Sequence, residues 1–271
     1  MKRSGTDKRT LLSEAVRLVR DGDVLALGGM TLYRRPMAFV RELLRREPRP
    51  RELTLLCFTG ALESDLLIGA GLVRRVRSCY FGLEAFGLAP MFTQSATAGT
   101  VQVVEETEAS LAFGLRAALA GVSFMPGQGW IGTDLLRVRP DVKLVGDPYG
   151  AGQYVAFPAI HCDVAVIHAL RADWAGNAEI GRNMGVDPEL GLLSERVIVT
   201  AEEVVERLNG PIEVTSLRVD AVVHSPGGAW PTSCFPLYVL DGQEIMRYTE
   251  SCPDDFEGYL TTFLARDGSD A

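Results

Sequence analysis

Short apolar runs alternate with amphipathic segments along this chain, a pattern typical of an α/β protein. The segment 7–20 carries Leu12, Val16 and Val19 on one helical face and is predicted to be the first helix. A turn follows, and the apolar run at 24–27 predicts the first strand. Together these segments predict a helix that leads directly into a buried strand.

The remaining segments continue the alternation. Further strands are expected at 53–58, 78–81, 101–104, 154–160, 164–169, 196–200 and 219–224, and helices from Pro36 onward, at 63–73, 109–120 and 201–208. Residues 82–99 contain Pro90 and small polar residues and predict an irregular loop, and the acidic segment around 254–257 predicts a terminal tail. Repeated strand, helix and strand units imply right-handed parallel crossovers, so we expect an open, mostly parallel, doubly wound sheet in a single domain over residues 1–271.

Composition excludes several classes of protein. The net charge of −8 argues against general nucleic-acid binding, which needs a basic surface. The longest uncharged apolar stretches are too short to cross a bilayer, and the N-terminus has no apolar signal core, so we expect a cytoplasmic protein without a membrane partner. Five widely spaced cysteines are expected to be reduced, and Cys57 and Cys79 to be small core residues. The three histidines show no metal-ligand spacing, so no metal is expected.

Two glycine-containing loops follow predicted strands and are candidates for ligand binding. Gly28 and Gly29 connect the first strand to the helix opened by Pro36, where an open α/β sheet binds ligands at its carboxyl edge. A plain tight turn is the alternative for this loop. The second loop carries Gln128 and Gly129, and its glycines let the backbone approach a ligand closely. Two such loops after two strands favour a shared cleft.

Charged side chains near these loops allow more than one interpretation. The arginines around the first loop predict either a solvated basic face or a docking site for an anion or partner: Arg34, Arg35, Arg41, Arg45 and Arg46. An acidic run comes directly before the helix at 109–120: Glu105, Glu106 and Glu108. At least two of these acids are expected to complement the helix N-terminus, while one carboxylate could serve as base or nucleophile. His168 is expected to be a core residue.

Four motifs in this chain resemble the alpha subunit of two-subunit family I CoA-transferases of the glutaconate CoA-transferase type. They are GGMTLYRRPMAFVREL at 28–43, FMPGQGWIGTDL at 124–135, DVAVIHALRADWAGNAEI at 163–180 and VDAVVHSPGGAWPTSC at 219–234. The resemblance covers nearly the whole chain. It implies the Rossmann-like CoA-transferase fold and, as partner, a homologous beta subunit.

The resemblance also implies chemistry. In this family a glutamate of the beta chain attacks an acyl-CoA thioester, and the CoA then passes to a second carboxylic acid. The substrates expected are therefore an acyl-CoA and a carboxylic acid, with no metal. By family position Gly28, Gly29 and Met30 would line the acyl or CoA cleft, with Gln128 and Gly129 opposite.

A second family leaves an alternative open. The chain is also similar to the alpha subunit of a steroid ring-opening CoA hydrolase, in which a glutamate at the strand-to-helix junction works on water or the substrate. Glu108 matches that position best and would act as the base. The hydrolase and the glutaconate type tend to carry an arginine where this chain has Gln128, and an amide replaces a guanidinium poorly. A third hypothesis is a CoA-binding module without its own catalysis.

Overall fold

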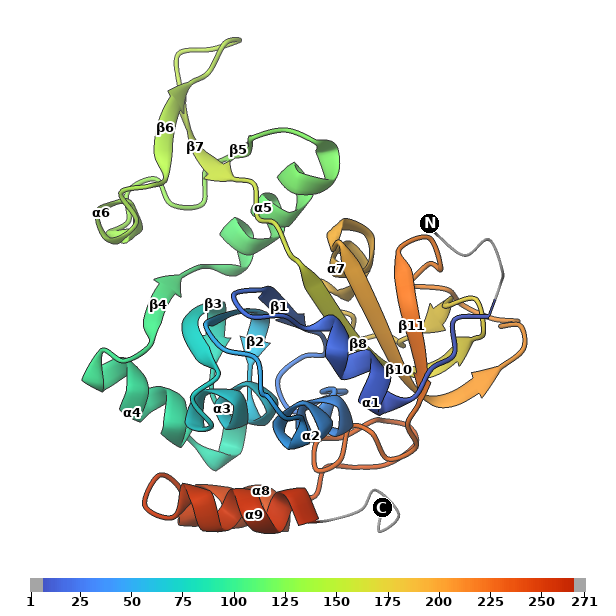
Figure 1. Cartoon of the computed structure of the whole chain (residues 1–271). Helices are drawn as coiled ribbons and strands as arrows, with labels where there is room; N and C mark the ends of the chain where they lie inside the picture. Colours follow the sequence, from blue (N-terminus) through green and yellow to red (C-terminus); the bar gives the residue numbers. More distant parts are fainter. Residues whose placement is uncertain (1–6, 266–271) are drawn as a thin grey trace.

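The computed structural model describes residues 7–265 and is built on one large sheet (Figure 1). Seven parallel strands stand in the order β11-β10-β8-β1-β2-β3-β4, and the short β9 pairs antiparallel with β8. Their bounds are β1 Val24–Leu27, β2 Leu53–Gly60, β3 Val73–Phe81, β4 Gln102–Glu105, β8 Val164–Asp173, β9 Ala178–Glu179, β10 Arg196–Val205 and β11 Val219–His224. The prediction of an open, mostly parallel α/β sheet is confirmed.

Strand β1 is the point at which the strand order changes direction. The chain adds β2, β3 and β4 on one side of β1, and it then returns to place β8 on the other side. Ligands of open α/β sheets bind beyond the carboxyl ends of the strands at such a switch point. The loop that follows Leu27 therefore begins at the position where this topology favours a binding site.

Alternating side chains of the strands supply two cores, one on each face of the sheet. In β1, Leu25 and Leu27 pack into one core and Ala26 into the other, as the two-residue period of a strand requires. The first core is covered by α1 Leu12–Ala15, α2 Met37–Arg45, α3 Leu62–Gly69, α4 Pro90–Ala98, α8 Gly242–Ser251 and α9 Phe256–Ala265. The second is covered by α5 Glu108–Ala120 and α7 Asp187–Leu193.

A separate antiparallel sheet interrupts the alternation between α5 and β8. It consists of β5 Phe124–Gly127, β6 Lys143–Gly146 and β7 Gln153–Pro158, with α6 Leu135–Val138 beside it. Figure 1 shows this small sheet outside the main body. We call residues 119–158 the outer module. The run at 154–160 was expected to be one more strand of the predicted parallel sheet, but it pairs with β5 and β6 instead.

Several predicted elements differ from the structure. The helix expected at 201–208 is the end of β10, because β8 is long enough to pair with it as far as Val205. The loop expected at 82–99 contains the 3₁₀ turn Glu84–Phe86 and α4. The expected acidic tail is instead the pair of helices α8 and α9. The first helix is shortened to α1 and the 3₁₀ turn Val16–Leu18, and α3 ends at Gly69 so that β3 begins at Val73.

No helix between residues 7 and 265 is both long and apolar enough to cross a membrane. Cys57 is fully buried, as expected, whereas Cys79 is only half-buried.

Candidate active site

A buried carboxylate of α7 holds the first glycine loop in place. Asp187, at the start of α7, accepts the backbone N–H of Gly29 at 3.0 Å and a guanidinium N–H of Arg34 at 2.8 Å. A Cβ at Gly28 would lie 2.9 Å from a carboxylate oxygen of Asp187. Residue 28 must therefore be glycine for the carboxylate to approach the loop this closely.

Gly29 is required for a second reason. Its φ of +85° lies in the left-handed region, and a Cβ there would lie 2.6 Å from the carbonyl oxygens of Tyr33 and Arg34. The N–H of Gly28 is bonded to the carbonyl of Val166, and that of Met30 to the carbonyl of Tyr33. The loop is thus a tight structure whose amides are bonded within the protein. Met30 is half-buried at the edge of the sheet.

The two arginines of this loop are internal. Arg34 and Arg35 have side chains that are 0% exposed. Arg35 pairs with the equally buried Glu63, whose Oε1 also accepts the hydroxyl of Ser64 at 2.6 Å. For these two residues, both interpretations of the basic cluster are wrong, since neither a solvated face nor a docking site for an anion is formed. The ion pairs instead hold the loop against α3 and α7.

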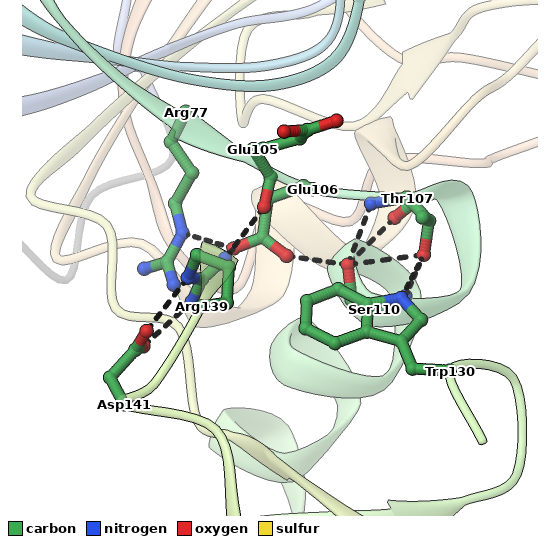
Figure 2. Close-up of polar contacts among 8 residues, drawn as sticks. All are labelled: Arg77, Glu105, Glu106, Thr107, Ser110, Trp130, Arg139 and Asp141. Carbon is green, nitrogen blue, oxygen red and sulfur yellow. Dashed lines mark hydrogen bonds and ion pairs between the residues drawn. The ribbon is translucent and has the colours of Figure 1, made fainter. Parts of the chain in front are cut away.

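The acidic run at the end of β4 divides into one buried carboxylate, Glu106, and two exposed ones, Glu105 and Glu108. Figure 2 shows Glu105 and the contacts of Glu106. Oε1 of Glu106 lies 2.7 Å from Nε of Arg77 and 2.8 Å from Nη1 of Arg139. Oε2 of Glu106 accepts the hydroxyl of Ser110. The two arginines therefore balance the charge of Glu106, and these contacts fix its position. Glu105 and Glu108 are the acids that reach the surface at this edge.

The second glycine loop is attached to the same helix terminus. Thr107 caps α5 in a capping box with Ser110, and its hydroxyl accepts the indole N–H of Trp130 at 2.9 Å (Figure 2). A Cβ at Gly129 would lie 3.6 Å from that of Ala109, in the first turn of α5. The loop that contains Gln128 and Gly129 consequently passes over the helix turn that begins with Glu108.

Residues of β2 and β3 connect the two loops along the edge. The thiol of Cys79 donates to the carbonyl of Phe58 at 2.7 Å. Burial raises the pKa of Cys79 to about 11, and the nearby negative charge of Glu108 adds to this effect. Gly185 lies beside both Phe58 and the carbonyl of Gly29. Phe58 and Cys79 therefore lie at the same edge of the sheet as the first loop and Glu108.

His168 is a buried structural residue, as predicted. Its ring nitrogens lie 2.8 Å from the hydroxyl of Thr200 and 2.8 Å from a carboxylate oxygen of Glu202. Burial lowers the pKa of His168 against the opposing effect of Glu202. The sequence pattern does not single out Glu202, because it predicts a helix at 201–208. Its carboxylate also accepts the hydroxyl of Tyr238 and the N–H of Gly227, which fixes the loop after β11.

His168, Glu202 and Cys234 could in principle hold a metal ion, because one donor atom from each lies within 4.8 Å of the others. Both ring nitrogens of His168 and both oxygens of Glu202 are, however, already bonded to protein groups. A cation would have to displace these bonds, and the arrangement is better explained as a hydrogen-bonded support for the loop.

Comparison with known proteins identifies the family of this chain. The family model for coenzyme A transferase matches residues 9–225. The chain is 35% identical to the A-type subunit of 3-oxoadipate CoA-transferase from Pseudomonas knackmussii over 239 residues, which cover 86% of this chain and 84% of the relative. It is 32% identical to the cholesterol ring-cleaving hydrolase IpdA subunit of Mycobacterium tuberculosis, with 96% and 94% covered.

Two solved structures have nearly the same fold. Glutaconate coenzyme A-transferase from Acidaminococcus fermentans superimposes with a TM-score of 0.88 at 28% identity, covering 96% of this chain and 90% of that one. The decarboxylase AibA/AibB gives a TM-score of 0.89 at 31% identity, with 96% and 99% covered. The family model, the relatives and the sheet topology agree, and the chain therefore belongs to the coenzyme A transferase family, as an alpha-type enzyme subunit.

Proposed function

We propose that this chain is the alpha subunit of a two-subunit enzyme that transfers CoA from an acyl-CoA to a carboxylic acid. In this proposal a homologous beta subunit carries the nucleophilic glutamate. Two relatives support the proposal, because both are A-type subunits of CoA-transferases, one for 3-oxoadipate and one for glutaconate. The chain would contribute one wall of a site that the beta subunit completes.

The observation that carries the choice of a transferase over a hydrolase is the environment of Glu108. Glu108 begins α5, and the loop that contains Gln128 passes over this helix turn, since a Cβ at Gly129 would lie 3.6 Å from that of Ala109. Within residues 7–265, the carboxylate of Glu108 has no hydrogen bond or ion pair that would orient it as a base. A hydrolytic base must be held toward a water molecule. Glu108 without a fixed cation beside it fits a substrate-lining role better.

The two loops would then have different tasks. The amides of Gly28 and Gly29 are bonded to Val166 and Asp187, so the first loop would act as a rigid wall, with Met30 as its accessible side chain. Gln128 offers both donor and acceptor atoms to the thioester or the acid, and Gly129 allows the backbone to come close. The thioester carbonyl would be oriented between the two loops.

Covalent trapping tests this proposal. The complex purified with its second subunit is incubated with an acyl-CoA, reduced with borohydride, and digested for peptide mass spectrometry. We expect a modified glutamate in the beta chain and CoA exchange between carboxylic acids. Modification of Glu105 or Glu108 in this chain, or thioester hydrolysis without exchange, would contradict the transferase assignment.

Glu108→Gln serves as the variant in the same assay. We expect a loss of exchange activity below about tenfold, because a lining carboxylate is not the reacting group. Loss of a general base costs about 10²–10⁴-fold. A loss of that size with an intact complex would favour the hydrolase function suggested by the ring-cleaving relative. Glu105→Gln is the matched control, since Glu105 is also exposed in the same acidic run.

The outer module supports the need for a second subunit. Its surface carries large apolar side chains, from a half-exposed Phe124 to Tyr149 at 98% exposure: Leu119, Val122, Phe124, Ile131, Val138, Leu144 and Tyr149. Its own core is small, formed mainly by Trp130, Val142, Val155 and Phe157. Exposed apolar surface concentrated in one segment marks an interaction site. We therefore assign this surface to contact with the beta subunit.

Charged substitutions in the outer module are expected to disrupt assembly. Leu144→Asp combined with Tyr149→Asp should release the beta chain, because two carboxylates would be buried in the interface. The measurement is native mass spectrometry of the gently purified complex, with the second chain identified by its peptides as a CoA-transferase subunit. Leu217→Asp is the control, since Leu217 is 72% exposed and lies outside the module. Equal retention of the beta chain in both variants would exclude the module as the interface.

A further inference from the structure

A cavity lies on the far side of Glu106 from the glycine loops, and its lining includes the two arginines that hold Glu106. It has a volume of about 500 Å³ and opens on the face of the sheet that carries α5. Four of its lining residues form one rung across four parallel strands, since Val24 pairs with Thr54, Thr54 with Arg75, and Arg75 with Gln102. These residues lie near the amino ends of their strands. The cavity is thus at the opposite end of the sheet from the glycine loops.

The charges that line this cavity are unbalanced. Arg77 and Arg139 contribute two positive charges and are paired with Glu106 and Asp141. Arg75 adds a third positive charge. Its Nε donates to the neutral amide oxygen of Gln102 at 2.9 Å, and no carboxylate of residues 7–265 forms an ion pair with it. The lining therefore carries one positive charge in excess.

Arg75 is held in a position suited to ligand binding. Its side chain is half-buried, and the bond from Nε to Gln102 fixes the plane of the guanidinium. Neither Nη group has a hydrogen bond within the part of the chain that the structure describes. The hydroxyl of Thr54, the next residue on the rung, also has no such partner there. Oriented donors without acceptors therefore line the cavity.

The spacing of the arginines favours an anion. Arg75 and Arg77 are two residues apart on β3, so their side chains share one face of the sheet. Like charges on neighbouring positions of a sheet repel each other. A planar guanidinium fork binds phosphate oxygens through two parallel hydrogen bonds. A phosphate group would supply the missing charge and acceptors together.

We propose that this cavity is a phosphate-binding site in which Arg75 is the main ligand and Thr54 an additional donor. The phosphate could be inorganic or a phosphate monoester of a larger molecule, such as the 3′-phosphate of CoA, since the recognising chemistry is the same. The site is separate from the loops assigned to the transferase reaction, so it does not depend on that assignment.

The test is isothermal titration of the intact complex with inorganic phosphate in low-salt chloride buffer. We expect one binding event per alpha chain that weakens as salt is raised. Arg75→Gln should weaken binding by about tenfold or more, because it removes a charge-assisted bidentate contact. Arg75→Lys should have an intermediate effect, since it keeps the charge without the fork.

Arg74→Gln is the matched control. Arg74 is adjacent on β3 but does not line the cavity, and it pairs loosely with Glu52 at 3.7 Å. Both glutamine variants remove one positive charge and should keep the Tm of the parent. Absence of phosphate binding, or equal weakening in both variants, would overturn the proposal. Titration with CoA and with dephospho-CoA identifies the source of the phosphate. If the site binds the 3′-phosphate, the complex binds CoA more tightly than dephospho-CoA, and Arg75→Gln removes this difference.

Discussion

Glu63→Ala is expected to destabilise the protein by about 3–5 kcal/mol, because it leaves the Arg35 guanidinium buried without its counter-charge. Both side chains are 0% exposed. Nε and Nη1 of Arg35 have no further partner among residues 7–265, so nothing there can replace Glu63. For a chain of this length, the expected fall in Tm is roughly 6–20 °C. Thermal unfolding followed by circular dichroism measures it.

Two controls separate burial from charge in this experiment. Glu52→Ala removes the carboxylate of an exposed pair with Arg74 and should change the unfolding free energy by less than about 1 kcal/mol. The double substitution of Glu63 and Arg35 by methionine should recover most of the lost stability, since apolar residues often replace a buried ion pair without cost. A double variant as unstable as Glu63→Ala would show that packing rather than the unpaired charge is responsible.

Gly29→Ala is expected to abolish the proposed CoA exchange, by more than about 100-fold, and to lower stability. A Cβ at this position would lie 2.6 Å from two backbone carbonyl oxygens, which no side-chain movement can relieve. The left-handed backbone adds a strain of about 1–3 kcal/mol. The loop must move as a whole, and the expected site wall moves with it. Exchange kinetics and thermal unfolding are both measured.

Gly71→Ala is the control for backbone strain alone. Gly71 has a φ of +74°, and a Cβ there would meet no atom within 4 Å. This variant should lose some stability but keep normal exchange activity. Comparable behaviour of the two alanine variants would mean that the first loop can rearrange, and it would remove the basis for treating it as a rigid wall.

Much of the fold could be predicted because local patterns and tertiary structure agree there. The apolar run of β1 and the capped helix α5 are specified by residues close in sequence. Three predictions are wrong because the deciding contacts come from residues far away in the sequence. Residues 201–205 continue as a strand because β8 lies beside them. The N–H groups of Met91 and Phe92 at the start of α4 are accepted by Asp65 of α3, 26 and 27 residues away. The aromatic side chains of α9 become part of the core by packing against elements far away in the sequence, such as α2.

The positions of the candidate site residues could be predicted in part, whereas their internal contacts could not. The first loop and Glu108 follow β1 and β4 at the carboxyl edge of the main sheet, as the positions of strand ends imply. The second loop follows β5 of the small sheet instead, and it reaches Glu108 through its contacts with the first turn of α5. The roles of the charged residues could not be predicted from their type. Arg34 and Arg35 look like surface cations in the sequence, and Glu106 looks like its exposed neighbours, yet all three are buried by partners far along the chain: Asp187, Glu63 and Arg139.

The bond between Gly29 and Asp187 joins residues 158 positions apart, and it has a consequence for synthesis of the chain. As a ribosome makes the protein from its N-terminus, β1 to β4 can pair with one another while the rest is still missing. The first loop, however, has neither its supporting carboxylate nor the neighbouring strand β8 at that stage. Nascent chains that end before Asp187 therefore contain an unfinished loop. The earliest part of the proposed site to be translated is among the last to acquire its final shape.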